Sequence, residues 1–242
     1  RGYDNAGDID MIIFRENTEG EYANVGGFLY ENFKDEVAVQ SSVFTRHGIE
    51  RVVRYAFELA RKRIGKKRLA SITKSNAQAY GMVLWDRIFS EVALEYPDIT
   101  TESLLVDAAC MNFIRRPESF DVVVASNLFG DILTDIGAQI TGSMGLAASA
   151  NINPERTFPS VFEPVHGSAP DITGRGIANP LATILSAGMM LEHLGEPQAA
   201  TAVHDACMTV LRDGEVIPAD LGGNATTVQL GAAVVAALES AP

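Results

Sequence analysis

Three aspartates in this chain could converge on a single cation. Asp131 and Asp135 are four residues apart in a segment predicted to be helical, so both carboxylates project from one face, and Asp107 stands at the end of a preceding predicted strand. Carboxylate oxygens without Cys or His ligands suit Mg²⁺ or Mn²⁺, and an incomplete protein shell leaves positions for substrate and water. Such a pair is usually a solvated helix face, but Asp131 directly follows a strand, where α/β sheets bind ligands.

Three further side chains could handle protons or a carboxylate. Lys74 follows the apolar run 69–73 within the sequence TKSN, and a lysine there could be a general base if its pKa were lowered by desolvation or a nearby cation. Arg15 could hold a carboxylate with two parallel hydrogen bonds, and Tyr22 could deliver a proton. A surface lysine and structural roles for Arg15 and Tyr22 are the alternatives.

The loop 163–171 (EPVHGSAPD), with Asn179 shortly after it, combines backbone donors with a carboxylate in a tight Gly/Pro segment. It is not a GxGxxG fingerprint. Asp171 could accept hydrogen bonds from adenosine ribose hydroxyls, and its charge would favour NAD over the phosphorylated cofactor. A local turn is an equally good explanation of this aspartate from chemistry alone.

Strands and helices alternate along the chain, which predicts an α/β protein. A domain boundary is expected near residue 141, and a glycine-rich connection between the first two strands. Strands are predicted at 9–14, 36–44, 69–73, 103–106, 120–125 and 161–162, and helices at 48–64, 78–95, 127–140, 179–194, 198–212 and 226–239.

Composition narrows the class of protein. The 242 residues are 47% hydrophobic and 21% charged, as in ordinary globular proteins, and the net charge of −12 would repel a phosphate backbone, so no nucleic-acid binding is expected. Cys110 and Cys207 lie in apolar stretches without metal-ligand spacing and are interpreted as buried thiols in a reducing cytoplasm. No apolar run reaches the length of a membrane span, and no signal or transit peptide is expected.

Read together, four segments resemble the isocitrate, isopropylmalate and tartrate family of β-decarboxylating dehydrogenases across essentially the whole chain. They are 15–22 (RENTEGEY), 73–76 (TKSN), 127–135 (NLFGDILTD) and 163–171 with Asn179. The sequences ANVGG after Tyr22 and NPERTFPS at 153–160 resemble the tartrate and D-malate dehydrogenase branch. The resemblance implies a two-domain isopropylmalate dehydrogenase-like fold.

Residue roles follow from that resemblance. Asp107, Asp131 and Asp135 would hold Mn²⁺ or Mg²⁺, Lys74 and Tyr22 would be catalytic, and Arg15 and Asn76 would bind substrate. A monovalent cation such as K⁺ is left open as an additional cofactor. The residues expected to bind NAD are Glu163, His166, Gly167, Ser168, Ala169, Asp171 and Asn179.

The resemblance also implies a homodimer with shared active sites, because Lys74 and Asp107 would reach the neighbouring subunit's site. Residues 1–141 would form the substrate, metal and dimerisation domain, with an arm at about 22–44 that clasps the partner. Residues 142–242 would be the C-terminal part of the NAD-binding domain.

The family's N-terminal βαβ portion, with a GDGIG-like segment and two further substrate-binding arginines, is missing here. We therefore expect the isolated chain to bind cofactor poorly and to be nearly inactive.

The expected reaction is NAD-dependent oxidation and β-decarboxylation of a 2-hydroxy dicarboxylate, namely D-malate, to pyruvate and CO₂, or tartrate. Isocitrate and 3-isopropylmalate are alternative substrates. A non-catalytic dimerising subunit or an inactive fragment is the alternative of another class.

Overall fold

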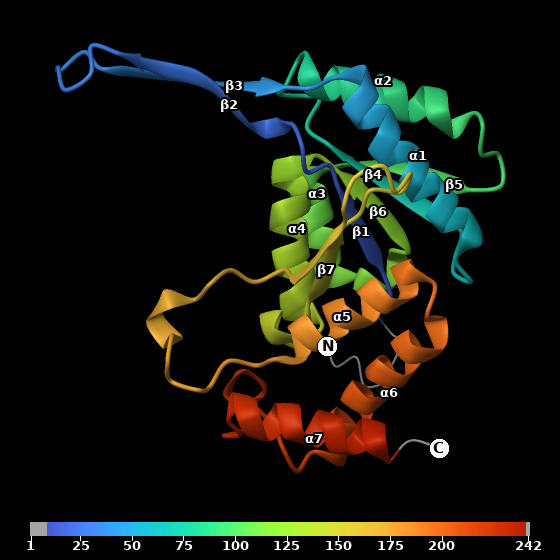
Figure 1. Cartoon of the computed structure of the whole chain (residues 1–242). Helices are drawn as coiled ribbons and strands as arrows, with labels where there is room; N and C mark the ends of the chain where they lie inside the picture. Colours follow the sequence, from blue (N-terminus) through green and yellow to red (C-terminus); the bar gives the residue numbers. More distant parts are fainter. Residues whose placement is uncertain (1–8, 241–242) are drawn as a thin grey trace. The chain divides into compact units, whose positions relative to one another are not determined.

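A computed structural model describes residues 9–240, which divide into two compact units between Gly137 and Ala138, inside a helix and close to the boundary expected at residue 141. Unit 1 has a four-stranded, fully parallel sheet in the order β1 (Ile12–Arg15), β6 (Val122–Ala125), β4 (Arg68–Thr73), β5 (Thr100–Leu105) (Figure 1). Unit 2 is helical with a short two-stranded sheet. The chain is therefore an α/β protein, as predicted.

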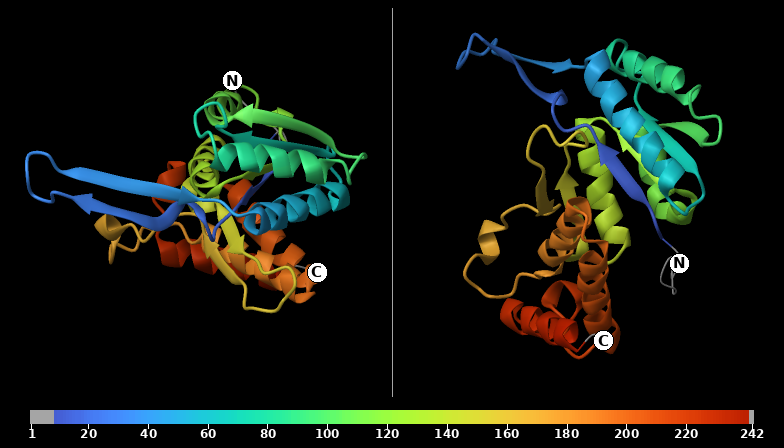
Figure 2. Two further views of the ribbon diagram at one scale, coloured as in Figure 1. Left: turned by 90° about the horizontal axis from the view of Figure 1, so that it is seen from above. Right: turned by 45° about the vertical axis from the view of Figure 1, so that its right-hand side comes forward.

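Helices cover both faces of the unit 1 sheet. On β1, Ile13 lies against helix α4 (Asn127–Ile140), and the next residue, Phe14, makes an edge-to-face contact with Tyr55 of α1 (Arg46–Lys62). Helix α2 (Gly81–Ala93) packs beside α1, and α3 (Val106–Arg115) packs against β5 and β4 (Figure 2). Parallel strands covered in this way read as continuous apolar runs.

The core of unit 1 forms where these helices meet the sheet. In α1, apolar residues at helical spacing are buried, and Thr45 caps the helix by accepting a hydrogen bond from Gly48. The largest fully buried side chains of the unit include Trp85, Phe57, Phe113 and Phe120. This packing holds the carboxyl ends of the four strands at one edge.

Two further strands of unit 1 form a separate ribbon outside the parallel sheet. β2 (Gly20–Leu29) pairs antiparallel with β3 (Val37–Val43), and the ribbon projects from the body of the unit (Figure 1). The prediction of a glycine-rich connection between the first two strands is therefore wrong. This segment forms a strand because pairing with β3 orders it in spite of its low strand propensity. The expected arm at 22–44 falls on this ribbon.

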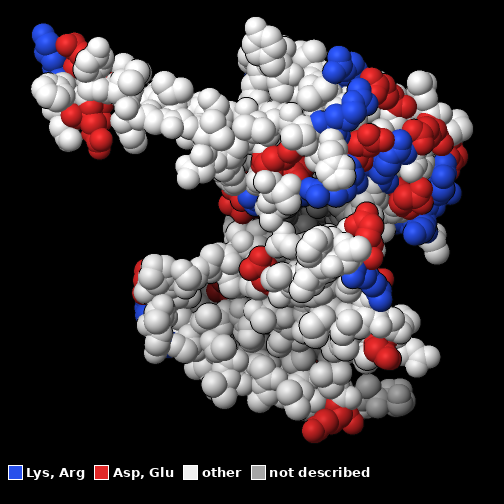
Figure 3. Space-filling view, turned by 45° about the horizontal axis from the view of Figure 1, so that its top comes forward, with Lys and Arg blue, Asp and Glu red and all other residues white. Residues whose placement is uncertain are grey.

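The surface of unit 1 mixes both signs of charge beside α1 and α2 (Figure 3). Three arginines of α1 each contact a carboxylate at 2.6 to 2.7 Å on α2 or on the segment that follows it. The pairs are Arg46–Glu91, Arg54–Glu95 and Arg61–Asp98.

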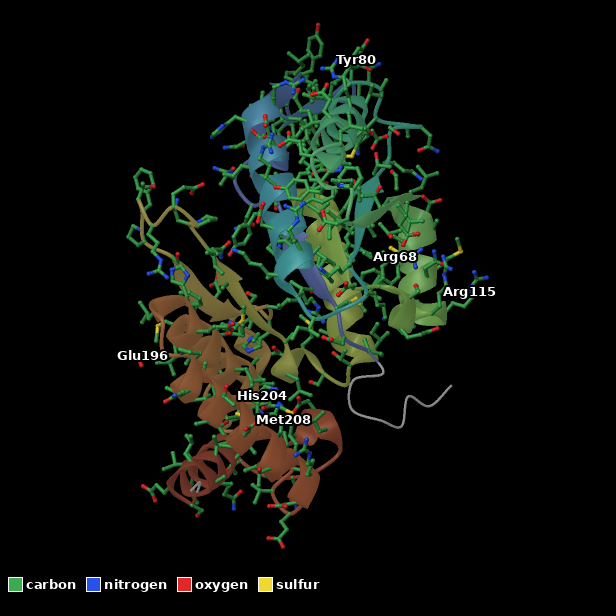
Figure 4. All side chains as sticks on the ribbon, turned by 90° about the vertical axis from the view of Figure 1, so that its right-hand side faces the viewer. Arg68, Tyr80, Arg115, Glu196, His204 and Met208 are labelled. Atoms are coloured by element: carbon green, nitrogen blue, oxygen red, sulfur yellow. The ribbon has the colours of Figure 1, made fainter. Side chains whose placement is uncertain are left out.

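Unit 2 has its own core. Strands β7 (Ala148–Asn151) and β8 (Val161–Pro164) pair antiparallel and pack on α5 (Leu181–Leu194), which contacts α6 (Pro197–Asp213), which in turn contacts α7 (Thr227–Glu239). Figure 4 labels Glu196, His204 and Met208 at and along α6. Leu181, Cys207 and Leu230 are fully buried between the helices. β7 and, in unit 1, α3 were not predicted from the sequence.

Candidate active site at the carboxyl edge of the parallel sheet

The carboxyl ends of all four parallel strands carry predicted site residues. Arg15 ends β1, α4 follows β6 after Ser126, Lys74 follows β4, and Asp107 lies two residues beyond β5, in the first turn of α3. Because β1 neighbours β6 and β4 neighbours β5, the strand order groups these residues into two pairs. Crevices beyond the carboxyl ends of strands are where α/β sheets bind ligands.

The first group is built around the Asp131 carboxylate. Arg15 donates from Nη1 to Asp131 Oδ1 at 2.5 Å, and Tyr22 donates from its hydroxyl to Asp131 Oδ2 at 3.0 Å. The guanidinium also donates from Nε and Nη2 to Asn127 Oδ1, at 3.0 and 2.7 Å, and lies 5.5 Å from the centre of the Tyr22 ring. The hydrogen bond to Asp131 raises the pKa of Tyr22, because a phenolate beside a carboxylate is disfavoured, so the protonated form is retained.

Gly130 allows this group to be so compact. A Cβ at residue 130 would lie 2.7 Å from Arg15 Cβ and 2.8 Å from Arg15 Cγ. Those separations are far below van der Waals contact, so only glycine lets α4 approach β1 this closely.

The second group is an ion pair. Lys74 donates from Nζ to Asp107 Oδ1 at 2.7 Å, and this hydrogen bond lowers the pKa of the Asp107 carboxyl. Asn76 is exposed in the turn that follows, where Ala77 and Gln78 both donate backbone hydrogen bonds to the Lys74 carbonyl. Lysine and carboxylate are thus adjacent, but neither contacts the Asp131 group.

The predicted metal ligands are not assembled within one chain. Asp131 and Asp135 lie one turn apart on α4, with Asp135 exposed, while Asp107 is held by Lys74. Over residues 9–240 no group of three or more His, Cys, Asp or Glu side chains is arranged to hold a metal ion. The α4 pair supplies the hard oxygen donors that fit Mg²⁺ or Mn²⁺, and completion of a site needs ligands from elsewhere.

The predicted cofactor loop lies in unit 2. Glu163 is in β8, where its Oε1 accepts from Asn151 Nδ2 at 3.0 Å. The His166 ring contacts the Gly167 carbonyl, and Ala169 adopts a left-handed conformation, φ 41°, just before the short 3₁₀ turn Pro170–Ile172. Gly167, Ser168 and Asp171 are exposed, so backbone and carboxylate groups of this loop are accessible to a ligand.

Asn179 is fixed by a contact that local sequence patterns did not reveal. Its Oδ1 accepts from the Leu181 backbone at the start of α5, and its Nδ2 donates to Asp220 Oδ2 at 3.0 Å. Ser143 donates to the same Asp220 oxygen at 2.5 Å. Asp220 was not singled out from the sequence because its partners are 41 and 77 residues away.

Unit 2 has two cavities that are lined by other residues. One, of about 440 Å³, is lined by α5 and α6 residues that include Met189 and His204, and the other, of about 280 Å³, by residues that include Phe158 and His193. None of the predicted site residues lines either cavity. Among residues 9–240 no helix is long and apolar enough to cross a membrane.

The chain belongs to the isocitrate/isopropylmalate dehydrogenase family, whose family model matches residues 3–234. The chain is similar to the tartrate dehydrogenase/decarboxylase of Pseudomonas putida, at 50% identity over 234 residues, and to the D-malate dehydrogenase [decarboxylating] of Escherichia coli, at 52% over 233 residues. Each match covers 94% of this chain and 64% of the relative, so the chain spans about 64% of these relatives' length.

Solved structures agree with this assignment. The isocitrate dehydrogenase of Methylococcus capsulatus matches with a TM-score of 0.89 and 41% identity, over 96% of this chain and 68% of that protein. The TT0538 protein of Thermus thermophilus also matches with a TM-score of 0.89, at 38% identity, over 97% of this chain and 46% of that one. The predicted resemblance to the family, and within it to tartrate and D-malate dehydrogenases, is confirmed.

Proposed function

We propose that this chain forms the substrate- and metal-binding part, and a portion of the NAD-binding part, of an enzyme that oxidises and decarboxylates a 2-hydroxy dicarboxylate. D-Malate or tartrate is the proposed substrate, because the relatives at 50% and 52% identity carry those names. The observation that supports the proposal most directly is the Asp131 carboxylate held by both Arg15 and Tyr22.

Each side chain of the site has a proposed task. Arg15 would exchange its contact with Asp131 for a substrate carboxylate, with Asn76 as a second contact, and Lys74 in its neutral form would take the proton of the substrate hydroxyl. Tyr22, whose hydroxyl lies 3.0 Å from Asp131 Oδ2, would deliver a proton to the carbon left by the departing CO₂.

Two bound groups would complete the chemistry. Mn²⁺ or Mg²⁺ held by Asp131 and Asp135 would supply Lewis-acid polarisation of the substrate oxygen, and NAD held by the 163–171 loop and Asn179 would accept the hydride. K⁺ remains a candidate for an additional monovalent cation.

A second copy of the chain is part of the proposal. Lys74 and Asp107 form a pair that makes no contact with the Asp131 group, so we propose that they serve the site of a partner subunit. Asp107 heads a face of α3 on which Met111 and Ile114 are also exposed. An interface along α3 would cover both apolar side chains and bring Asp107 to the partner.

The test is NADH production with Mn²⁺ on D-malate, tartrate, isocitrate and 3-isopropylmalate. It would use the 242-residue chain and a version joined to the N-terminal portion of a relative. We expect the joined version to turn over D-malate or tartrate, and the chain alone to show little activity. Tyr22→Phe and Lys74→Met should each lower kcat by about 100-fold or more.

Matched controls are Tyr80→Phe and Lys62→Met, which make the same chemical changes at exposed positions of unit 1 outside the ribbon. Turnover confined to isocitrate or 3-isopropylmalate would replace the proposed substrate. Absence of turnover on all four substrates by both versions would favour a non-catalytic dimerising subunit.

A further inference from the structure

The Glu21 carboxylate bridges the ribbon and the start of α4. Its Oε1 accepts from Ser126 Oγ at 2.7 Å, and its Oε2 accepts from the Leu128 backbone N–H at 3.2 Å. Ser126 is fully buried, and α4 begins at the next residue. Leu128 N–H is one of the helix's first amides, which have no partner within the helix, so Glu21 satisfies it from outside.

A carboxylate at this position has a second reason to be stable. The positive end of the helix dipole lies at the α4 N-terminus, where negative charge is favoured. The same turn is also held through the Asn127 side chain, which accepts from Arg15 and donates from Nδ2 to the Glu19 carbonyl at 3.0 Å. Arg15 and Glu19 hold the Asn127 side chain, while Glu21 holds the helix backbone.

The ribbon reaches α4 with two successive residues. Glu21 contacts Ser126 and Leu128, and Tyr22 contacts Asp131, one helical turn further on. Successive side chains of a regular strand point to opposite faces, but the β2–β3 register shifts between Gly20 and Val25. This irregularity lets Glu21 and Tyr22 both reach α4. Bulges beside functional sites often redirect a side chain in this way.

We propose that Glu21 is a positioning residue that fixes the first turn of α4 against β2, and thereby sets the separation of Tyr22 from the Asp131 carboxylate. The inference rests on the proposed function, in which Asp131 holds a divalent cation and Tyr22 delivers a proton. Glu21 itself touches neither group. Its role is to hold the backbone on which Asp131 is placed.

The experiment compares Glu21→Gln and Glu21→Ala with Glu215→Gln, which makes the same charge change at an exposed position in unit 2. Hydrogen exchange of residues 126–133 reports on the first turns of α4, and Mn²⁺ binding followed by electron paramagnetic resonance reports on Asp131. The protein is the 242-residue chain, with circular dichroism to confirm that each variant is folded. Glu21→Gln keeps one acceptor oxygen, so it remains informative if Glu21→Ala does not fold.

We expect faster exchange at the start of α4 in both Glu21 variants and a loss of Mn²⁺ affinity of about 10- to 100-fold, larger for Ala than for Gln, as is usual for groups that orient metal ligands. Glu215→Gln should change neither quantity. Unchanged exchange, or faster exchange with wild-type Mn²⁺ affinity, would overturn the positioning role alone. Absence of Mn²⁺ binding by the wild-type chain would overturn the metal site of the proposed function and this inference with it.

Discussion

At the scale of single residues, the site depends on how closely Arg15 approaches α4. The guanidinium reaches both Asn127 and Asp131 because residue 130 has no side chain. Gly137, further along α4, is in a different situation, since a Cβ there would meet only Ile13 Cδ1 at 3.6 Å, an ordinary contact. The two glycines form a matched pair within one helix.

We predict that Gly130→Ala destabilises the chain by about 1–3 kcal/mol, because the added methyl forces β1 and α4 apart. In the version joined to the N-terminal portion of a relative, Gly130→Ala should also raise KM for the substrate by displacing Arg15. Gly137→Ala should be neutral or stabilising by up to about 1 kcal/mol, since alanine is the better helix former. Urea unfolding of both variants measures the difference, and equal stabilities would show that the close approach is unimportant.

Individual site residues could be predicted from the sequence better than the contacts that hold them. Arg15, Tyr22 and Asp131 were separate candidates, and the fold brings them within hydrogen-bond distance, although their roles stay predictions. Glu21 was not singled out, because its partner Ser126 is 105 residues away and no local pattern reports such a contact. Asn127 was predicted only as part of a motif. The hydrogen bonds that its side chain accepts from Arg15 depend on the pairing of β1 with β6.

At the scale of elements, α3 connects the site to the surface. Asp107 occupies its first turn, and Met111 and Ile114, four and seven residues on, are 63% and 67% exposed. This spacing places all three side chains on one face. Arg115, at the end of the same helix, also projects outward (Figure 4).

We predict that Met111→Lys weakens self-association of the chain, because a charge would be buried where the proposed interface is apolar. Leu94→Lys is the control, since Leu94 is 84% exposed and lies at the end of a different helix, α2. Sedimentation velocity over a range of protein concentrations measures the dissociation constant of each variant. A wild-type constant for Met111→Lys would exclude an interface on this face of α3.

The elements that could be predicted are those with strong local signals. The predicted helix 127–140 coincides with α4, and the buried strand at 120–125 contains β6, because continuous apolar runs and helical spacing were clear. α3 was missed because Leu105, at its N-cap, makes no capping hydrogen bond through its side chain, so the usual start signal is lacking. β2 was missed because its order depends on pairing with β3 and not on its own glycine-rich sequence.

At the scale of the whole molecule, the proposed division of one site between two subunits can be tested by mixing inactive variants. Lys74→Met and Asp131→Asn would each be inactive alone, but a mixed dimer would contain one intact site. The two variants would be co-expressed in the version joined to the N-terminal portion of a relative. With random pairing about half of the dimers are mixed, so at most about a quarter of wild-type activity should be restored. The measurement is NADH production by the purified mixture.

Asp131→Asn mixed with Tyr22→Phe provides the control, because Tyr22 contacts Asp131 within one chain and no mixed site would then be intact. Recovery with both mixtures would show that Lys74 is not the only side chain supplied by the other subunit. Recovery with neither would place Lys74 in the site of its own subunit.

The β2–β3 ribbon has a consequence for the proposed activity at low protein concentration. A two-stranded ribbon alone in water is marginally stable, and this one exposes Phe28, Tyr30 and Phe33. If a second copy stabilises it, the order of β2 obeys mass action, and β2 carries Tyr22. Dilution would then unfold the ribbon and abolish the activity together. The specific activity would therefore report the concentration of the chain.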